Sequence, residues 1–256
     1  MKTKLFVHIQ AQLLPARMPF LLNRKLQPEI GCQEVGIDEL DLVEMSRCAT
    51  QLVDRELSNT VHAPFADFNP GSSKKQERKR AHAMCRQSLQ LAGALQSRLV
   101  VFHPGIPYRA TTYQQNIWLE NCLAFWPEYI KQAEQRDLII AIENIYEPSA
   151  DIFLDLFKEL GSTNFGHCFD IGHCHMFTQK PLDDWFAKLS PYILHLHLHD
   201  NHGQQDEHLP IGAGQIDFPT FFANAIKLPN HPSMTLESHS LPELEVSLAA
   251  IQSYLD

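Results

Sequence analysis

The chain has 256 residues, 44% of them hydrophobic and 20% charged, which is enough apolar material to bury a substantial core. Its 21 basic and 30 acidic residues give a formal net charge of −9, which disfavours nucleic acid as the partner because non-specific affinity for a polyanion comes from basic surface. Six cysteines without a C-x-x-C pair predict reduced thiols and a cytoplasmic protein, and no signal peptide or membrane span is expected.

Short apolar runs alternate with longer helical patterns along the whole chain. The runs predict strands at Leu5–Ile9, Glu34–Ile37, Thr60–His62, Leu99–His103, Leu138–Glu143, Gly166–Asp170, Ile193–His197 and Met234–Glu237. The stretches between them predict helices at Glu39–Leu57, Lys74–Leu95, Tyr113–Arg136, Ser149–Leu160, Asp183–Leu189, Pro219–Ile226 and Pro242–Leu255. Asp38, Ser149 and Asp217 are expected to cap helices, and Pro242 suits a first helical turn.

This alternation of strands and helices predicts an α/β fold, a closed (β/α)₈ TIM barrel that takes residues 1–256 as a single domain. An open, doubly wound sheet is the alternative. Such a sheet normally carries a glycine-rich phosphate loop after its first strand, and this sequence has none there.

Histidine is over-represented, with fourteen residues where ordinary usage would give roughly six. The densest patch alternates histidine with leucine, so strand parity places His195, His197 and His199 on one face. The leucines belong against the outer helices and the histidines toward the barrel axis. Three inward imidazoles are costly unless they bind something or are hydrogen-bonded.

Polar residues recur where the predicted strands end, which is the end at which barrels of this kind build their active sites. Imidazole and carboxylate groups together are ligands for zinc, manganese or iron. The sequence therefore predicts a polynuclear centre of divalent ions, Zn²⁺ or Mn²⁺. The candidate ligands are His62, His103, Glu143, Asp170, His173, His197, Asp206, His208 and Glu237.

Taken in order from Val61 to Glu237, these motifs resemble the xylose-isomerase-like TIM barrels. That group contains sugar phosphate isomerases and epimerases as well as AP endonucleases of the endonuclease IV type. The resemblance implies three metal sets: His62, His103 and Glu143; Glu143, Asp170, His197 and Glu237; and His173, Asp206 and His208. The isomerase and epimerase branch typically needs only the middle set.

Two segments bear on the choice between the branches. Ketose epimerases of the group resemble a pattern with an arginine at the place of Gly203. The endonuclease branch uses basic loops, and the candidate here, residues 72–80, is better interpreted as the solvated start of a helix. Leu209–Phe218, in contrast, resembles a segment common in sugar phosphate isomerases and epimerases.

Two functions follow. In the first, a metal-dependent isomerase or epimerase of a small sugar or sugar phosphate, the metal polarises a carbonyl while Glu143 and Glu237 move the proton. The alternative is a trinuclear phosphodiesterase or phosphatase of the endonuclease IV type. The acidic charge favours the first, with a small carbohydrate as partner, and leaves homo-oligomer formation open.

Several other polar residues have expected supporting roles. Asn144 is expected to orient a loop, His8 to contact substrate from the first strand, and Asp200 to accept a hydrogen bond from a metal-bound histidine. Arg109 is a candidate partner for a substrate phosphate.

Overall fold

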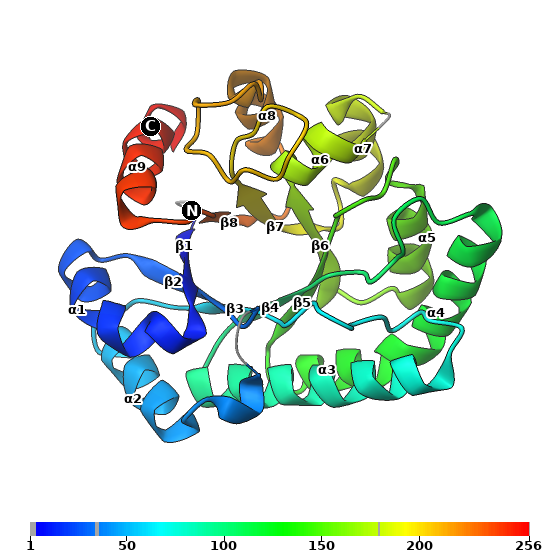
Figure 1. The fold of residues 1–256 in the computed structure, drawn as a ribbon, viewed down its shortest axis with the longest axis horizontal. Coiled ribbons are helices and arrows are strands. Elements are labelled where there is room, and N and C mark those ends of the chain that lie inside the picture. The colour runs from blue at the N-terminus through cyan, green and yellow to red at the C-terminus, as the bar shows by residue number, and fades with distance from the viewer. Residues whose placement is uncertain (1–3, 34–35, 179, 256) are drawn as a thin grey trace.

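A computed structural model describes residues 4–33, 36–178 and 180–255 of the chain. Within these residues, eight parallel strands pair in sequence order, and β1 also pairs with β8, so that the sheet closes into a barrel (Figure 1). Helices surround this ring. The predicted (β/α)₈ barrel is confirmed, and the open sheet is excluded.

Seven of the predicted strands lie within one residue of the observed ones. The strands are β1 (Leu5–Gln10), β2 (Gln27–Gly31), β3 (Thr60–His62), β4 (Leu99–Phe102), β5 (Ile139–Glu143), β6 (Phe165–Asp170), β7 (Ile193–Leu198) and β8 (Ser233–Leu236). Strands of a barrel are buried on both faces, so they read as short apolar runs.

The prediction for the second strand is wrong. The strand is Gln27–Gly31, whereas Ile37 lies in a short 3-10 helix, Ile37–Glu39, and residues 34–35 lie outside the described part of the chain. Pro28 and Glu29 disfavour a strand by local propensity. Glu29 is nevertheless fully buried inside the barrel, where residues distant in sequence satisfy it.

The helices follow the predicted alternation with two additions, α1 and α6. Their bounds are α1 (Leu14–Arg24), α2 (Leu42–Val53), α3 (Lys75–Leu95), α4 (Thr112–Glu134), α5 (Asp151–Leu160), α6 (Ile171–Phe177), α7 (Leu182–Leu189), α8 (Phe218–Ala225) and α9 (Leu241–Leu255), with a short 3-10 helix, Ala11–Leu13, before α1. The prolines of α1 at positions 15 and 19 hide its helical pattern, since proline disfavours helix interiors.

Two of the predicted caps are wrong. Asp41, not Asp38, accepts from the first turn of α2, and Ser149 donates its hydroxyl to Asp151 instead of capping α5, which starts after Ala150. The cap at Asp217 is confirmed, because its carboxylate accepts the Thr220 N–H. Pro242 lies in the first turn of α9, as expected.

The alternation along β7 also has the expected consequence. His195, His197 and His199 are buried and contact groups of the barrel interior, whereas Leu196 and Leu198 belong to the apolar core. No helix among the described residues is long and apolar enough to cross a membrane.

Candidate metal centre

The structure brings all nine candidate ligands to the C-terminal mouth of the barrel. His62, Glu143 and Asp170 are the last residues of β3, β5 and β6, His103 and Glu237 directly follow β4 and β8, and His197 lies in β7. His173 belongs to α6, and Asp206 and His208 to the loop after β7. A cavity of about 240 Å³ opens above them, lined by seven of the nine together with His8 and Phe65.

The first set gathers around one carboxylate oxygen. Oε2 of Glu143 lies 3.1 Å from His62 Nε2 and 3.5 Å from His103 Nε2. The other ring nitrogen of His62, Nδ1, lies 3.0 Å from the Ala63 carbonyl oxygen. A carbonyl only accepts, so Nδ1 carries a proton, and Nε2 is the ring nitrogen that faces the carboxylate and would ligate a metal there.

The central set surrounds Nδ1 of His197. This atom lies 3.4 Å from Glu143 Oε1, 3.4 Å from Glu237 Oε1 and 3.9 Å from Asp170 Oδ2. Ligand atoms around a tetrahedral zinc ion with bonds near 2.0–2.1 Å are about 3.3 Å apart. Ligand atoms of Asp170, His197 and Glu237 all lie within 4.8 Å of one another, as do those of His62, Glu143 and His197, so a small divalent cation fits in either group.

The third set centres on Asp206. Its Oδ2 lies 3.2 Å from Nε2 of both His173 and His208. Nδ1 of His173 donates to the carbonyl of Asn144 at 3.0 Å, which directs its Nε2 toward Asp206. Asn144 also exchanges two hydrogen bonds with the backbone of Asp170, so it orients this loop as expected.

Burial and neighbouring charges shift the pKa values of the site residues. Burial raises the pKa of Glu143, but the imidazoles of His197 and His103 outweigh burial and hold that pKa well below its usual range. Burial lowers the pKa of His103 to about 3, so this ring is neutral. Burial also lowers the pKa of His208, yet the carboxylates of Asp206 and Glu237 raise it to about 9.

One functional residue escaped the sequence prediction, namely Glu29 on β2. Its Oε2 accepts from Thr60 Oγ1 at 2.9 Å, Thr235 Oγ1 at 3.0 Å and His195 Nε2 at 3.1 Å. Its Oε1 lies 2.9 Å from Nε2 of His197 as a close charge pair, although the contact lacks hydrogen-bond geometry. Glu29 thus holds the ring of His197 with Nδ1 toward the three carboxylates.

The structure also bears on the roles expected of His8 and Asp200. His8 lines the mouth, in keeping with its expected place. Asp200 does not hold a histidine; its carboxylate accepts the backbone N–H groups of Gly212, Gly214 and Ile216 at 2.8–3.1 Å. The short loop after β7 needs an acceptor for these N–H groups, and Asp200 supplies it.

Buried polar atoms without a hydrogen-bond partner indicate whether the site suits a metal, because a bound cation would satisfy them. Among the described residues, His197 Nδ1 and Asp170 Oδ2 are buried without a hydrogen-bond partner, which is costly in the absence of a ligand. Both atoms belong to the central set. A mixed nitrogen and oxygen donor set of this kind suits Zn²⁺ or Mn²⁺, so the residues fit a divalent cation.

A model of the xylose isomerase-like TIM barrel matches residues 29–254 of the sequence. The chain belongs to this family. The uncharacterized protein MJ1311 of Methanocaldococcus jannaschii is 32% identical over 217 residues, which cover 80% of this chain and 73% of that protein.

Two solved structures extend the likeness over the full barrel. A D-tagatose 3-epimerase-like protein is 27% identical, with a TM-score of 0.83, and the match covers 100% of this chain and 97% of that one. The TTHB071 protein from Thermus thermophilus, in crystals soaked with zinc chloride, is 22% identical, with a TM-score of 0.81 and coverage of 98% and 97%. The second likeness shows the fold alone.

Proposed function

We propose that the protein is a divalent-metal-dependent isomerase or epimerase of a small sugar or sugar phosphate. The observation that carries this proposal is the position of two carboxylates. Glu143 and Glu237 come from β5 and β8, on opposite sides of the barrel ring (Figure 1), and each has an oxygen 3.4 Å from Nδ1 of the same histidine, His197. The likeness to a D-tagatose 3-epimerase-like protein supports the same conclusion.

The central set would hold the metal through Glu143, Asp170, His197 and Glu237. A divalent ion bound there supplies Lewis acidity, which polarises a carbonyl and acidifies the neighbouring C–H. His62, His103 and Glu143 on one side, and His173, Asp206 and His208 on the other, offer places for further ions. We expect between one and three Zn²⁺ or Mn²⁺ ions per chain.

The two carboxylates would move the proton. The neighbouring imidazoles keep Glu143 ionised, so one of its oxygens can accept a proton from the carbon beside the carbonyl. Glu237 faces the same space from the opposite wall. One carboxylate removes the proton from one face of the carbon, and the other, which enters the step protonated, gives its own proton to the opposite face, so the configuration is inverted.

We also propose a cytoplasmic location and a small carbohydrate as the partner. All six cysteines are buried and unpaired, in keeping with a cytoplasmic protein. Two cations of the basic segment at the start of α3 form ion pairs with nearby carboxylates: Lys74 pairs with Glu77, and Arg80 pairs with Asp67. A small carbohydrate is therefore a better partner than nucleic acid.

Hydrogen exchange in heavy water tests the activity. Metal-loaded protein is incubated in D₂O with D-tagatose, D-allulose or D-fructose, and deuterium on the carbon beside the carbonyl is followed by NMR. We expect exchange with at least one ketose. In Glu143→Gln and Glu237→Gln its rate should fall by about 10²–10⁴-fold, the usual contribution of a general acid or base.

The matched control is Glu159→Gln, an exposed glutamate of α5, which should exchange at the wild-type rate. Absence of exchange with all three ketoses and their 6-phosphates, in protein shown to contain metal, would contradict the proposal.

A second candidate function is a trinuclear phosphoesterase, because the third set is as compact as the other two. Asp206 bridges His173 and His208 at 3.2 Å on each side, and clustered metal ions support phosphoester hydrolysis. Metal counting by mass spectrometry separates the candidates. Three zinc ions, one of them lost in His208→Ala but retained in His231→Ala, together with cleavage of abasic-site DNA, would favour the hydrolase over the epimerase.

A further inference from the structure

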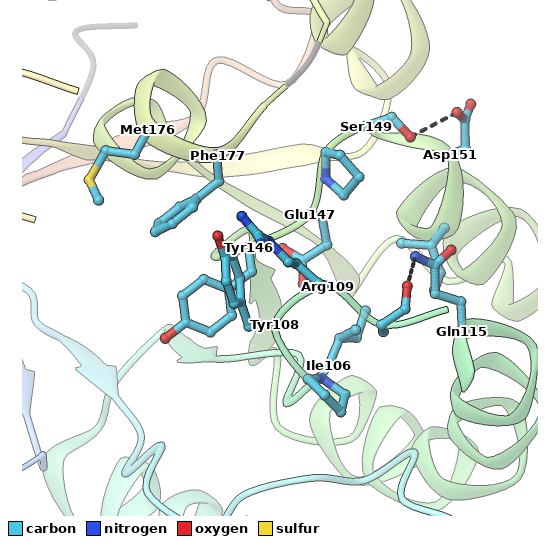
Figure 2. Close-up of a pocket in the computed structure, with 14 residues that line it drawn as sticks. Ile106, Tyr108, Arg109, Gln115, Tyr146, Glu147, Ser149, Asp151, Met176 and Phe177 are labelled. Carbon is cyan, nitrogen blue, oxygen red and sulfur yellow. Dashed lines mark hydrogen bonds between the residues drawn. The ribbon is translucent and has the colours of Figure 1, made fainter. Parts of the chain in front are cut away.

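A second and larger cavity, of about 610 Å³, lies beside the metal mouth. Figure 2 shows it between the loops that follow β4 and β5 and the end of α6. We call it the distal pocket and define it by Ile106, Tyr108, Arg109, Tyr146, Glu147 and Phe177. None of these residues belongs to the metal sets, so the proposed proton transfer leaves the pocket unused.

The distal pocket and the metal mouth both adjoin a third cavity. A connecting cavity shares Ile106, Tyr146 and Phe177 with the distal pocket. On its other side, the same connecting cavity shares Phe65, His103, His173 and Asp206 with the metal mouth. The three cavities therefore follow one another across the same end of the barrel.

One wall of the pocket is aromatic. The ring centroids of Tyr108, Tyr146 and Phe177 are separated by 5.1–6.1 Å in edge-to-face arrangements. Figure 2 shows the three rings gathered on one side of the pocket. Tyr108 and Tyr146 are 55% and 42% exposed, so they present apolar faces and hydroxyl groups to a ligand at once.

The remaining wall is polar and nearly balanced in charge. Arg109 is the one cation among the described lining residues, and its guanidinium packs 5.0 Å from the ring centroid of Tyr108. Glu147 is 5% exposed; its Oε2 accepts the Ile145 N–H at 2.7 Å, but its Oε1 has no hydrogen-bond partner among the described residues. Ser149 and Asp151 add a hydroxyl and a second carboxylate.

This lining suits a neutral polyhydroxylated ring better than an anion. A sugar hydroxyl both donates and accepts, so it can exchange hydrogen bonds with the hydroxyls of Tyr108 and Tyr146 and accept from Arg109. A phosphate would meet one cation and two carboxylates in the same wall. The volume also exceeds what a phosphate group fills, and lies within the roughly 300–1,000 Å³ of organic-ligand pockets.

We propose that the distal pocket binds a glycosyl unit joined to the sugar at the metal, so that the preferred substrates are glycosylated ketoses. This inference rests on the proposed function for the identity of the sugar at the metal. It adds the substrate class, a disaccharide or longer glycoside, and names Tyr108, Tyr146 and Arg109 as residues that select it.

Calorimetric titration of the metal-loaded protein tests the proposal. The probes are D-fructose, the glucosyl-fructoses turanose, leucrose and isomaltulose, which differ in the linked oxygen, and fructose 6-phosphate. We expect at least one glucosyl-fructose to bind about tenfold more tightly than fructose, as one well-packed aromatic contact allows. In Tyr108→Ala the ratio of the two affinities should fall to about one, while Tyr113→Ala, an exposed tyrosine outside the pocket, keeps it.

Three results would overturn the proposal: no glucosyl-fructose binds more tightly than fructose, the advantage survives Tyr108→Ala, or fructose 6-phosphate alone gains affinity and loses it in Arg109→Ala. The last result would assign the pocket to an anion. The calorimetric titration measures binding, whereas the experiment in heavy water measures hydrogen exchange. Failure of the glycosyl site can therefore be distinguished from failure of the proposed function. A protein that binds glucosyl-fructoses but exchanges no hydrogen contradicts the proposed function and leaves the glycosyl site standing.

Discussion

Glu29 is the residue on which the geometry of the metal centre depends most. Its carboxylate is fully buried and has donors on three other strands, Thr60 on β3, His195 on β7 and Thr235 on β8. It also faces Nε2 of His197 at 2.9 Å. A carboxylate behind a metal-ligating imidazole fixes its tautomer and ring orientation and raises its basicity.

Replacement of Glu29 by glutamine should weaken metal binding while leaving the barrel folded. The amide keeps the size of the side chain, but it brings an N–H group toward imidazole nitrogens that need an acceptor. We expect the zinc affinity to fall by about 10–100-fold, measured by competition with a chromophoric chelator. Glu39→Gln, at an exposed glutamate outside the metal sets, should bind zinc normally, and an unaltered affinity in Glu29→Gln would show that His197 is oriented by its neighbours alone.

Glu147 makes stability depend on pH. Burial raises its pKa to about 7 from an ordinary value of 4.5, so the folded protein holds this proton more tightly than the unfolded chain. The stabilisation is complete below about pH 4.5 and is lost as the pH rises to 7. The pKa difference corresponds to about 3 kcal/mol.

The glutamine of Glu147→Gln cannot ionise. The free energy of unfolding of this variant should therefore not decrease as the pH rises through 7, as it does in the wild type. We expect the variant to gain about 3 kcal/mol on the wild type between pH 4.5 and pH 8, read from urea unfolding at each pH. The exposed Glu159→Gln serves as control. A constant difference between variant and wild type across this range would mean that folding does not shift the pKa of Glu147.

At the scale of elements, the six strands that carry the candidate ligands were predictable and β2 was not. Strands β3 to β8 are apolar runs that end in a polar residue or are followed by one, a pattern visible within a few residues of sequence. The case for β2 rests on Glu29, whose partners lie 31, 166 and 206 residues away. No local pattern reports such contacts, and local propensity alone rejects the strand.

The candidate site also has a part that the sequence predicted and a part that it did not. Its nine polar residues were found because barrels place function at strand ends. The distal pocket was not, since it is formed by loops whose conformation depends on the fold. Arg109, for example, adopts a left-handed backbone conformation with φ of 55°, which sequence does not announce in a residue other than glycine or asparagine.

At the scale of the whole molecule, the metal centre joins most of the barrel. Its nine residues come from the ends of β3 to β8, from α6 and from the loop after β7. A cation bound among them ties these elements together in the folded state only, so metal binding adds to the free energy of unfolding by mass action.

Chelation should therefore lower the melting temperature. With zinc at about 1,000 times its dissociation constant, the stabilisation is about 4 kcal/mol, which corresponds to a shift on the order of 10 °C for a chain of this size. Calorimetric scans with zinc and with excess EDTA measure it, and zinc added back should restore the transition. The triple variant His197→Ala, Asp170→Ala and Glu237→Ala should show little response to zinc; a full response would place the stabilising ion elsewhere.

The ring of donors around Glu29 also bears on synthesis at the ribosome. Glu29 emerges early, whereas His195 and Thr235, two of its three hydrogen-bond donors, lie near the other end of the chain. Until those strands leave the exit tunnel, closing the first strands over Glu29 would bury a carboxylate with Thr60 as its only observed hydrogen-bond donor, which is costly. We therefore expect the barrel to close around Glu29 only after β7 and β8 have been made.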